Sequence, residues 1–134
     1  MDLEPYTLES VQVVMTAQSN REKFYILEKE KVILGWAQIK KYSDREGYKY
    51  ACETAVYLDK QQLRKGYGTY LKKFIIDQCR KFDYNHLVAK IQADNDISIL
   101  YNEKLGYTIV GKQKKIGFVN GVWKDVVIMQ LILD

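Results

Sequence analysis

Two glycines, Gly66 and Gly68, stand where a β-prone segment is followed by a long run of residues with helical spacing. At the N-terminus of a helix, free backbone N–H groups and the helix dipole favour an anion, and glycines let the anion approach the main chain closely. Thr69 adds a hydroxyl donor. The segment before the helix is also basic, through Lys60, Arg64 and Lys65. The pattern favours a pyrophosphate-binding turn, although two glycines alone more often serve only a tight turn between a strand and a helix.

Two common nucleotide-binding motifs are absent from this region. A Walker loop requires GxxxxGK[ST], and the dinucleotide fingerprint requires a third glycine where this chain has Leu71. The anion expected at the turn is therefore not held through either motif.

Glu53 is the second candidate for chemistry. If residues 48–58 form a regular strand, Glu53 shares a face with Ala51, Ala55 and Tyr57. A carboxylate among small apolar and aromatic neighbours is partly desolvated, which suits it to act as a general base. The alternative is a glutamate that faces water on an edge strand. The nearby glycine turn favours the base.

The third candidate is the segment 93–98, which follows a predicted strand and opens a predicted helix. Asn95 or Asp96 is an ordinary N-cap at this position. Tyr101 and Tyr107 carry hydroxyls able to donate a proton, but the chain contains 11 tyrosines, so most of them are expected to be packing residues.

Composition limits the class of protein. The 134 residues are 47% hydrophobic and 28% charged, which indicates one folded domain over residues 1–134. The net charge of +4 is spread along the chain without a basic helix face, which disfavours nucleic acid. Cys52 and Cys79 form no CxxC motif and His86 is the single histidine, so no metal site is expected and the thiols should be buried and reduced. No apolar run approaches the ~20 residues of a membrane span, so we expect a cytoplasmic protein without a membrane partner.

The hydrophobic pattern predicts helix, three strands, helix, strand, helix and two strands, in that order. This order implies an α/β (α+β) fold with helices packed on a mixed sheet. The expected elements are a short helix at 7–20, strands at 24–27, 32–39 and 48–58, a long amphipathic helix at 67–82, a strand at 87–91, a helix at 96–105 stopped by Gly106, and strands at 107–115 and 126–133.

Taken in order, these segments resemble the GNAT acetyltransferase superfamily, and within it the phosphinothricin and methionine sulfone acetyltransferase branch. The resemblance covers residues 5–133 and implies a mixed, largely antiparallel central sheet with helices on both faces. The motifs that carry it are Arg45-x-x-Tyr48, Glu53, Val56-Tyr57-Leu58, Gly66-x-Gly68, Asp94-Asn95-Asp96-x-Ser98, Glu103-x-Leu105-Gly106-Tyr107 and Gly117-Phe118-x-Asn120-Gly121-x-Trp123-x-Asp125-Val126.

The resemblance implies acetyl-CoA as co-substrate. The backbone of residues 56–58 would pair with the pantetheine arm, and residues 64–69 would hold the pyrophosphate. The cofactor-binding residues implied are Val56, Tyr57, Leu58, Arg64, Lys65, Gly66, Tyr67, Gly68, Thr69, Asn95 and Lys104.

The resemblance also implies the catalytic and substrate residues. Glu53 would take a proton from the substrate ammonium, directly or through water, and the free amine would attack the thioester carbonyl. Arg45, Tyr48 and Tyr57 match positions that line the amino-acid pocket, where a guanidinium suits a carboxylate or phosphinate oxygen.

The chain departs from the branch at three places. Leu63 replaces the arginine or glutamine that usually opens the pyrophosphate loop, and Asn102 stands where the branch has a histidine general acid. The strand and helix that usually begin the fold have no room before Pro5, so an N-terminally short chain is expected. The alternatives are a naturally short version, an incomplete one, or one in which the second subunit of a homodimer covers the open side of the acceptor pocket.

The function expected is acetyl transfer from acetyl-CoA to the primary amine of a small amino-acid-like acceptor such as phosphinothricin, methionine sulfone or methionine sulfoximine. Another amine or a protein N-terminus is the alternative within the same chemistry. A non-catalytic CoA-binding module is the alternative from another class.

Overall fold

The computed structural model describes residues 11–18, 22–59 and 66–134. These residues form seven strands, two α-helices and one short 3-10 helix, η2. The elements in chain order are β1 (Val11–Gln18), β2 (Glu22–Lys29), β3 (Val32–Lys41), η2 (Glu46–Tyr48), β4 (Ala51–Leu58), α1 (Tyr67–Lys81), β5 (His86–Gln92), α2 (Asp96–Lys104), β6 (Thr108–Val119) and β7 (Val122–Ile132).

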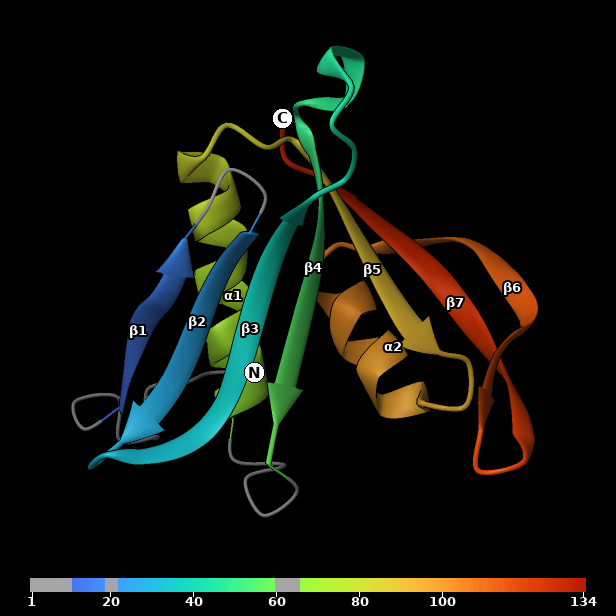
Figure 1. The fold of residues 1–134 in the computed structure, drawn as a ribbon, viewed down its shortest axis with the longest axis horizontal. Coiled ribbons are helices and arrows are strands. Elements are labelled where there is room, and N and C mark those ends of the chain that lie inside the picture. The colour runs from blue at the N-terminus through green and yellow to red at the C-terminus, as the bar shows by residue number, and fades with distance from the viewer. Residues whose placement is uncertain (1–10, 19–21, 60–65) are drawn as a thin grey trace.

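The strands form one sheet in the order β1-β2-β3-β4-β5-β7-β6 (Figure 1). Strands β4 and β5 are parallel neighbours, and the other neighbouring pairs are antiparallel. The chain can place β5 parallel to β4 because the long helix α1 connects them and carries the chain back along the sheet. The mixed, largely antiparallel sheet predicted from the sequence is confirmed.

The strand pairs β2–β3 and β6–β7 are hairpins with short turns. In the predicted β2–β3 hairpin, Glu30 and Lys31 have φ of 51° and 69°, the left-handed conformation that a two-residue turn between twisted strands requires. The β6–β7 hairpin is longer than predicted, since its strands reach Val119 and Val122 around an Asn-Gly turn. The prediction ended the first strand at Lys115, where the ladder is irregular between Gln113 and Gly117 before pairing resumes. The exposed side chains of β6 are tolerated because it is an edge strand.

The predicted N-terminal helix over residues 7–20 is wrong where the structure describes it. Residues 11–18 form the edge strand β1, and Val13 pairs with Leu27 of β2. Val13 and Val14 are β-branched, and their preference for a sheet outweighs a weak helical spacing. The rest of the predicted helix lies outside the described residues.

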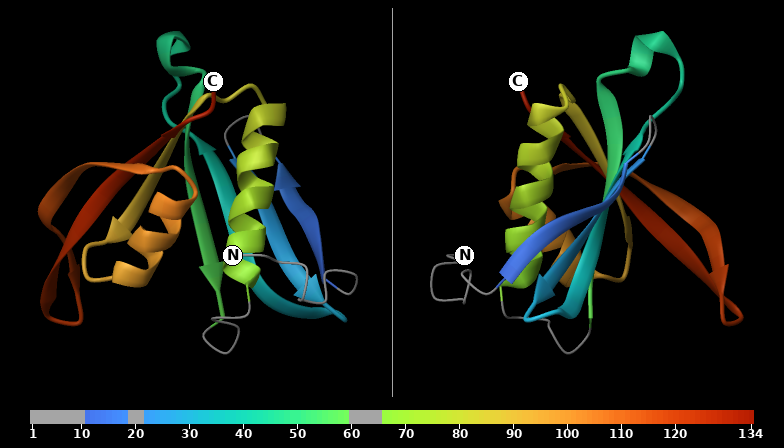
Figure 2. Two further views of the ribbon diagram at one scale, coloured as in Figure 1. Left: turned by 180° about the vertical axis from the view of Figure 1, so that it is seen from behind. Right: turned by 60° about the vertical axis from the view of Figure 1, so that its left-hand side comes forward.

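Both predicted later helices are present, and both lie on the same face of the sheet (Figure 2). The expectation of helices on both faces is therefore not met by the described part of the chain. Helix α1 buries Leu71, Ile75 and Cys79 against the sheet, which is the apolar stripe seen in the sequence. Helix α2 ends as predicted, before Gly106 with a φ of 103°.

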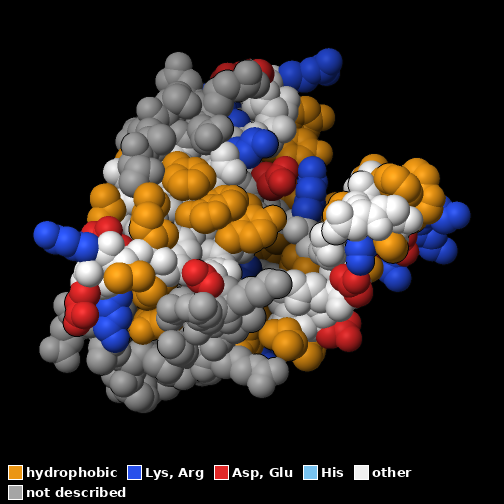
Figure 3. Space-filling model, turned by 60° about the horizontal axis from the view of Figure 1, so that its bottom comes forward, with side chains coloured by type: hydrophobic (Ala, Val, Ile, Leu, Met, Phe, Trp, Pro, Cys, Tyr) orange, Lys and Arg blue, Asp and Glu red, His pale blue; other side chains and the backbone are white. Residues whose placement is uncertain are grey.

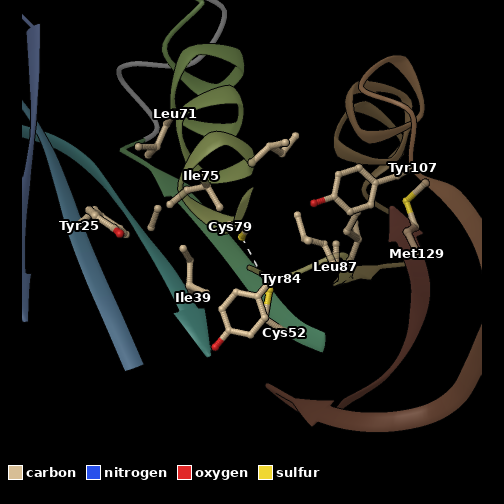
Figure 4. Packing of buried hydrophobic residues seen from close by; sticks show 14 of the residues in the cluster. Tyr25, Ile39, Cys52, Leu71, Ile75, Cys79, Tyr84, Leu87, Tyr107 and Met129 are labelled. Carbon is tan, nitrogen blue, oxygen red and sulfur yellow. Dashed lines mark hydrogen bonds between the residues drawn. The ribbon is translucent and has the colours of Figure 1, made fainter. Parts of the chain in front are cut away.

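The core lies between this helical layer and the sheet (Figure 4). Tyr25 and Ile39 from the sheet face Leu71 and Ile75 of α1. The thiols of Cys52 and Cys79 are free and buried, as predicted, with their sulfur atoms 3.7 Å apart. The hydrogen bond with Cys79, together with burial, raises the pKa of the Cys52 thiol, so that thiol stays protonated and unreactive.

Within the described ranges, no helix is both long and apolar enough to cross a bilayer.

Candidate active site

The sheet opens between its two parallel strands. The β4–β5 ladder runs only from Ala51↔His86 to Thr54↔Ala89, and beyond it both strands continue without pairing to each other. A cleft of about 330 Å³ occupies the opening. Its walls are residues 54–57 of β4, residues 89–92 of β5, Lys72 of α1, and Asn95 and Ser98 at the start of α2.

The edge of β4 that faces the cleft is free of strand pairing. On its other edge, β4 pairs with β3 from Ala37↔Val56 to Gly35↔Leu58. Peptide groups alternate in direction along a strand, so part of the backbone of residues 55–58 points toward the cleft. An extended ligand that carries amide groups can hydrogen-bond to this edge in place of a strand. The three residues predicted to hold the pantetheine arm, Val56, Tyr57 and Leu58, lie here.

The N-terminus of α1 lies beside the end of β4 (Figure 2). A Cβ atom added to Gly68 would meet the Leu58 side chain at 3.2 Å, so the two backbones are close. Gly66 caps the helix with a φ of 84°, a conformation that glycine adopts without strain. Tyr67 and Thr69 are both buried in the first turn, and the N–H groups at this end of the helix point toward the space beyond β4. Leu63, Arg64 and Lys65, together with Lys60, lie outside the described residues.

Glu53 is on the face of β4 that carries no helix. Its neighbours Cys52 and Thr54 are buried on the helical face, so Glu53, Ala55 and Tyr57 share the opposite face as predicted. Its Oε1 atom lies 3.3 Å from Nζ of Lys90, a residue that lines the cleft. The carboxylate therefore stands at the rim of the opening, with 31% of its side chain exposed.

A second, larger cavity of about 650 Å³ lies on the same face. Tyr42, Tyr48 and Tyr50 form one wall, and strands β5, β6 and β7 form the floor and the other wall. Lys90 lines both this cavity and the cleft. The predicted substrate residue Tyr48 lines it as well. The other two predicted substrate residues do not, because Arg45 precedes the exposed η2 turn and Tyr57 lies farther along β4.

Tyr57 belongs instead to an aromatic row that crosses three strands. Its ring stacks on Trp36 at 4.5 Å between centroids, and Trp36 stacks on Phe24 at 5.2 Å. Figure 3 shows hydrophobic side chains gathered in a row on this side of the molecule. Tyr57 is 58% exposed, so its ring is available to a ligand or a protein partner.

The two predicted site residues of α2 lie apart. Asn95 caps the helix, its Oδ1 accepts a hydrogen bond from the Ser98 N–H at 3.1 Å, and it lines the cleft. Lys104 is exposed in the last turn of the helix and does not contribute to the cleft wall.

Lys72 is a cleft residue that the sequence did not reveal. Its Nζ donates a hydrogen bond to Oδ1 of Asn102 at 3.1 Å, and Asn102 is buried. Burial lowers the pKa of Lys72 to about 8. In the sequence, Lys72 and Lys73 look alike as polar residues of an amphipathic helix. Only the contact between α1 and α2 distinguishes Lys72.

The arrangement defines a class of protein. A mixed sheet that opens between parallel strands, with a glycine-capped helix at the end of the opening, can hold an extended ligand with amides along its length and an anionic group at one end. Residues 2–107 match the model of the acetyltransferase (GNAT) family. The chain therefore belongs to the GNAT acetyltransferase family.

Several characterised relatives are similar in sequence. The chain is 31% identical over 109 residues to the L-methionine sulfoximine/L-methionine sulfone acetyltransferase of Salmonella typhimurium, an alignment that covers 81% of this chain and 64% of the relative. It is 30% identical to the phosphinothricin N-acetyltransferase of Streptomyces viridochromogenes, covering 80% of this chain and 58% of that protein. The chain thus spans slightly less than two thirds of the length of these relatives.

Solved structures show the same fold. An N-acetyltransferase from Staphylococcus aureus superimposes with a TM-score of 0.80 at 26% identity, covering 84% of this chain and 68% of that one. A phosphinothricin acetyltransferase from Sinorhizobium meliloti, solved in complex with acetyl-CoA, gives a TM-score of 0.77 at 26% identity and covers 84% of this chain and 61% of that one.

Proposed function

We propose that this protein transfers the acetyl group of acetyl-CoA to the primary amine of a small, amino-acid-like acceptor. The observation that carries the proposal is the opening between β4 and β5, with the glycine-capped start of α1 at its end. The named activities of the Salmonella and Streptomyces relatives support acceptors such as methionine sulfone, methionine sulfoximine and phosphinothricin.

The residues of the cleft fit acetyl-CoA. The unpaired edge of residues 56–58 suits the two amides of the pantetheine arm, and the first turn of α1, at residues 66–69, suits the pyrophosphate. Gly68 leaves room there that a side chain would fill, since its Cβ would press on Leu58. The bound thioester supplies an activated acetyl group, and Asn95 contributes to the wall of the same cleft.

Glu53 is proposed as the general base. An amine held in the cavity beside Tyr48 lies on the same face of the sheet as the Glu53 carboxylate, which would take the ammonium proton directly or through a water molecule. Arg45, which precedes the turn that contains Tyr48, and Tyr57, which lies farther along β4, are also proposed to bind the acceptor. Removal of the proton leaves a nucleophilic amine that can attack the thioester.

The proposal also includes a homodimer in the cytoplasm. The aromatic row of Phe24, Trp36 and Tyr57, in which Tyr57 is exposed and the other two are half-buried, supports a partner subunit on the face without a described helix.

Binding and turnover test the proposal separately. Calorimetric titration with acetyl-CoA should give saturable binding at one site, desulfo-CoA should bind with similar affinity, and ATP should bind much more weakly. Release of CoA thiol is then followed with methionine sulfone, methionine sulfoximine and phosphinothricin as acceptors. Binding without thiol release for any amine would identify a non-catalytic CoA-binding module, and absence of binding by the folded protein would refute the proposal.

The variant Glu53→Gln tests whether Glu53 acts as the general base. It keeps the shape of the side chain, so acetyl-CoA affinity should be unchanged while turnover near neutral pH falls about 100-fold or more. Glu103→Gln, on the exposed side of α2, is the matched control and should behave as the wild type. Full activity of the Glu53→Gln variant would remove Glu53 from the mechanism.

A further inference from the structure

Lys72 projects from α1 into the cleft where acetyl-CoA is proposed to bind. The residue is five positions beyond the first residue of the helix, which places it about 8 Å along the helix axis from the N-terminal turn. It is therefore too far along α1 to belong to the pyrophosphate site. Gly68 lies against Leu58 at the open end of β4, and α1 runs back along the sheet from there because it connects two parallel strands. Lys72 is one helical turn beyond Gly68, so it lies farther from the open end of the cleft.

Asn102 fixes the direction of the Lys72 side chain. Its Oδ1 accepts from Lys72 Nζ at 3.1 Å, and its Nδ2 donates to the Ser98 carbonyl at 2.9 Å. This second hydrogen bond determines which end of the amide faces the lysine. An ammonium carries three N–H groups, and within the described residues only the one directed at Asn102 has a protein partner. The others are available to a ligand in the cleft.

The groups around Lys72 do not neutralise its charge. Helix α2 contributes Asn95, Ser98 and Asn102, which do not titrate, and the titratable residues of the cleft walls are Tyr57 on β4 and Lys90 on β5. No carboxylate in the described part of the chain forms an ion pair with Lys72.

We propose that Lys72 is a catalytic residue, the general acid that gives a proton to the departing thiolate of CoA. The inference rests on the acetyl transfer proposed above. When the amine nitrogen forms its bond to the acetyl carbon, the carbon–sulfur bond breaks and its electron pair stays on sulfur. The sulfur takes a proton from Nζ, leaving neutral Lys72, which regains a proton from solvent. The proton lost by the amine goes to Glu53.

The acidity of Lys72 matches this role. A thiol has an ordinary pKa of about 8.5, and burial lowers the pKa of Lys72 to about 8, so a proton can pass between them at little free-energy cost. Tyr107, one of the two tyrosines considered from the sequence as proton donors, is less suitable. Its hydroxyl lies 3.4 Å from Thr54 Oγ1, and burial raises its pKa to about 12. Lys72 also explains how the site can operate with an asparagine at position 102, because Asn102 orients the acid.

The first test does not require turnover. The ultraviolet absorbance of the thiolate reports the pKa of the thiol of bound CoA. In the wild type the ammonium of Lys72 should stabilise the thiolate and lower this pKa, and Lys72→Met should raise it by one unit or more, which is tenfold in the ionisation equilibrium. Lys73→Met, an exposed change on the same helix, should leave the pKa unchanged. A thiol pKa that is equal in the wild type and in Lys72→Met overturns the inference even if acetyl transfer is established.

The second test uses the pH profile. Wild-type kcat should fall above about pH 8, where Lys72 loses its proton. Lys72→Met should lose this alkaline limb and turn over about 100-fold more slowly with unchanged acetyl-CoA affinity, whereas Lys73→Met should match the wild type. Lys72→Arg keeps the charge but does not release a proton, so it should remain slow. Full activity of Lys72→Arg would assign the residue an electrostatic role and overturn the proton transfer, and failure of CoA to bind at all would overturn both proposals.

Discussion

The buried hydroxyls of Tyr25 and Tyr107 are expected to make opposite contributions to the stability of the core. Both side chains are almost completely buried. The hydroxyl of Tyr107 has Thr54 Oγ1 within 3.4 Å, whereas the hydroxyl of Tyr25 has no hydrogen-bond partner among the described residues. A buried hydroxyl without a partner carries a desolvation cost that a phenyl ring does not.

The two Tyr-to-Phe variants should therefore change stability in opposite directions. Tyr25→Phe is expected to raise the free energy of unfolding by about 0.5–1 kcal/mol, and Tyr107→Phe to lower it by about 0.5–1.5 kcal/mol. Urea unfolding of the two variants beside the wild type measures both values. Destabilisation by Tyr25→Phe would show that this hydroxyl has a partner.

Lys72 should make stability depend on pH in the alkaline range. Its pKa is about 8 in the folded protein against 10.5 for the free side chain, so the folded state binds fewer protons between these values and the free energy of unfolding rises with pH across this window. Below about pH 8 Lys72 is charged in the folded state, so the whole desolvation cost of its ammonium lowers the free energy of unfolding. Lys72→Met should then be more stable than the wild type below this pH.

The advantage of Lys72→Met should shrink as the pH approaches 10.5. Urea unfolding at several pH values measures it, with Lys73→Met as the control for simple loss of a positive charge. If the difference in unfolding free energy between Lys72→Met and the wild type did not depend on pH, the ammonium of Lys72 would be in water and not buried.

At the scale of elements, Gly35 in β3 sets the position of the cleft wall. A Cβ atom at this residue would collide with the carbonyl oxygen of Tyr57, which lies in the backbone of the neighbouring strand. Gly35→Ala should force β3 and β4 apart at the residues that line the opening, lowering the free energy of unfolding by about 1–3 kcal/mol and weakening acetyl-CoA binding. Gly111→Ala, a site with open space around it, is the control. Equal stability and affinity in the two variants would contradict this account.

The cap of α2 links helix stability to the same cleft. Asn95→Ala removes the acceptor of the Ser98 N–H and should cost about 1 kcal/mol. Ser98→Ala keeps its backbone N–H, so it should preserve the cap and cost less. Urea unfolding of both variants measures their free energies of unfolding. Equal values for Asn95→Ala and Ser98→Ala would show that Asn95 does not cap the helix.

Sequence reasoning predicted the elements with strong local signals. The stripe of Leu71, Ile75 and Cys79 identified α1, and Gly106 marked the end of α2. It failed for β1, whose conformation is determined by pairing with β2 rather than by its own spacing. Glu53 was placed on the correct face by strand alternation, but Lys72 could not be recognised because its role depends on Asn102, which lies 30 residues away in the sequence.

At the scale of the whole molecule, a ligand in the cleft would join two halves of the sheet. Strands β1–β4 form one half, and β5, β7 and β6 form the other. Acetyl-CoA present at about 100 times its Kd is expected to raise the free energy of unfolding by about 2.7 kcal/mol. Thermal unfolding with and without acetyl-CoA measures the effect, with ATP as the control. An unchanged transition at saturating acetyl-CoA would be inconsistent with binding to the folded state.

The four paired positions between β4 and β5 set the angle at which the two strands diverge. Beyond them β4 extends from Ala55 to Leu58, a segment about 13 Å long. A change of roughly five degrees in this angle would move the far end of the segment by about 1 Å, enough to decide whether a ligand amide meets the strand at hydrogen-bonding distance. Cys52 belongs to this paired segment and its sulfur contacts Cys79 of α1, so the packing of α1 on the sheet helps to set the width of an opening that neither cysteine lines.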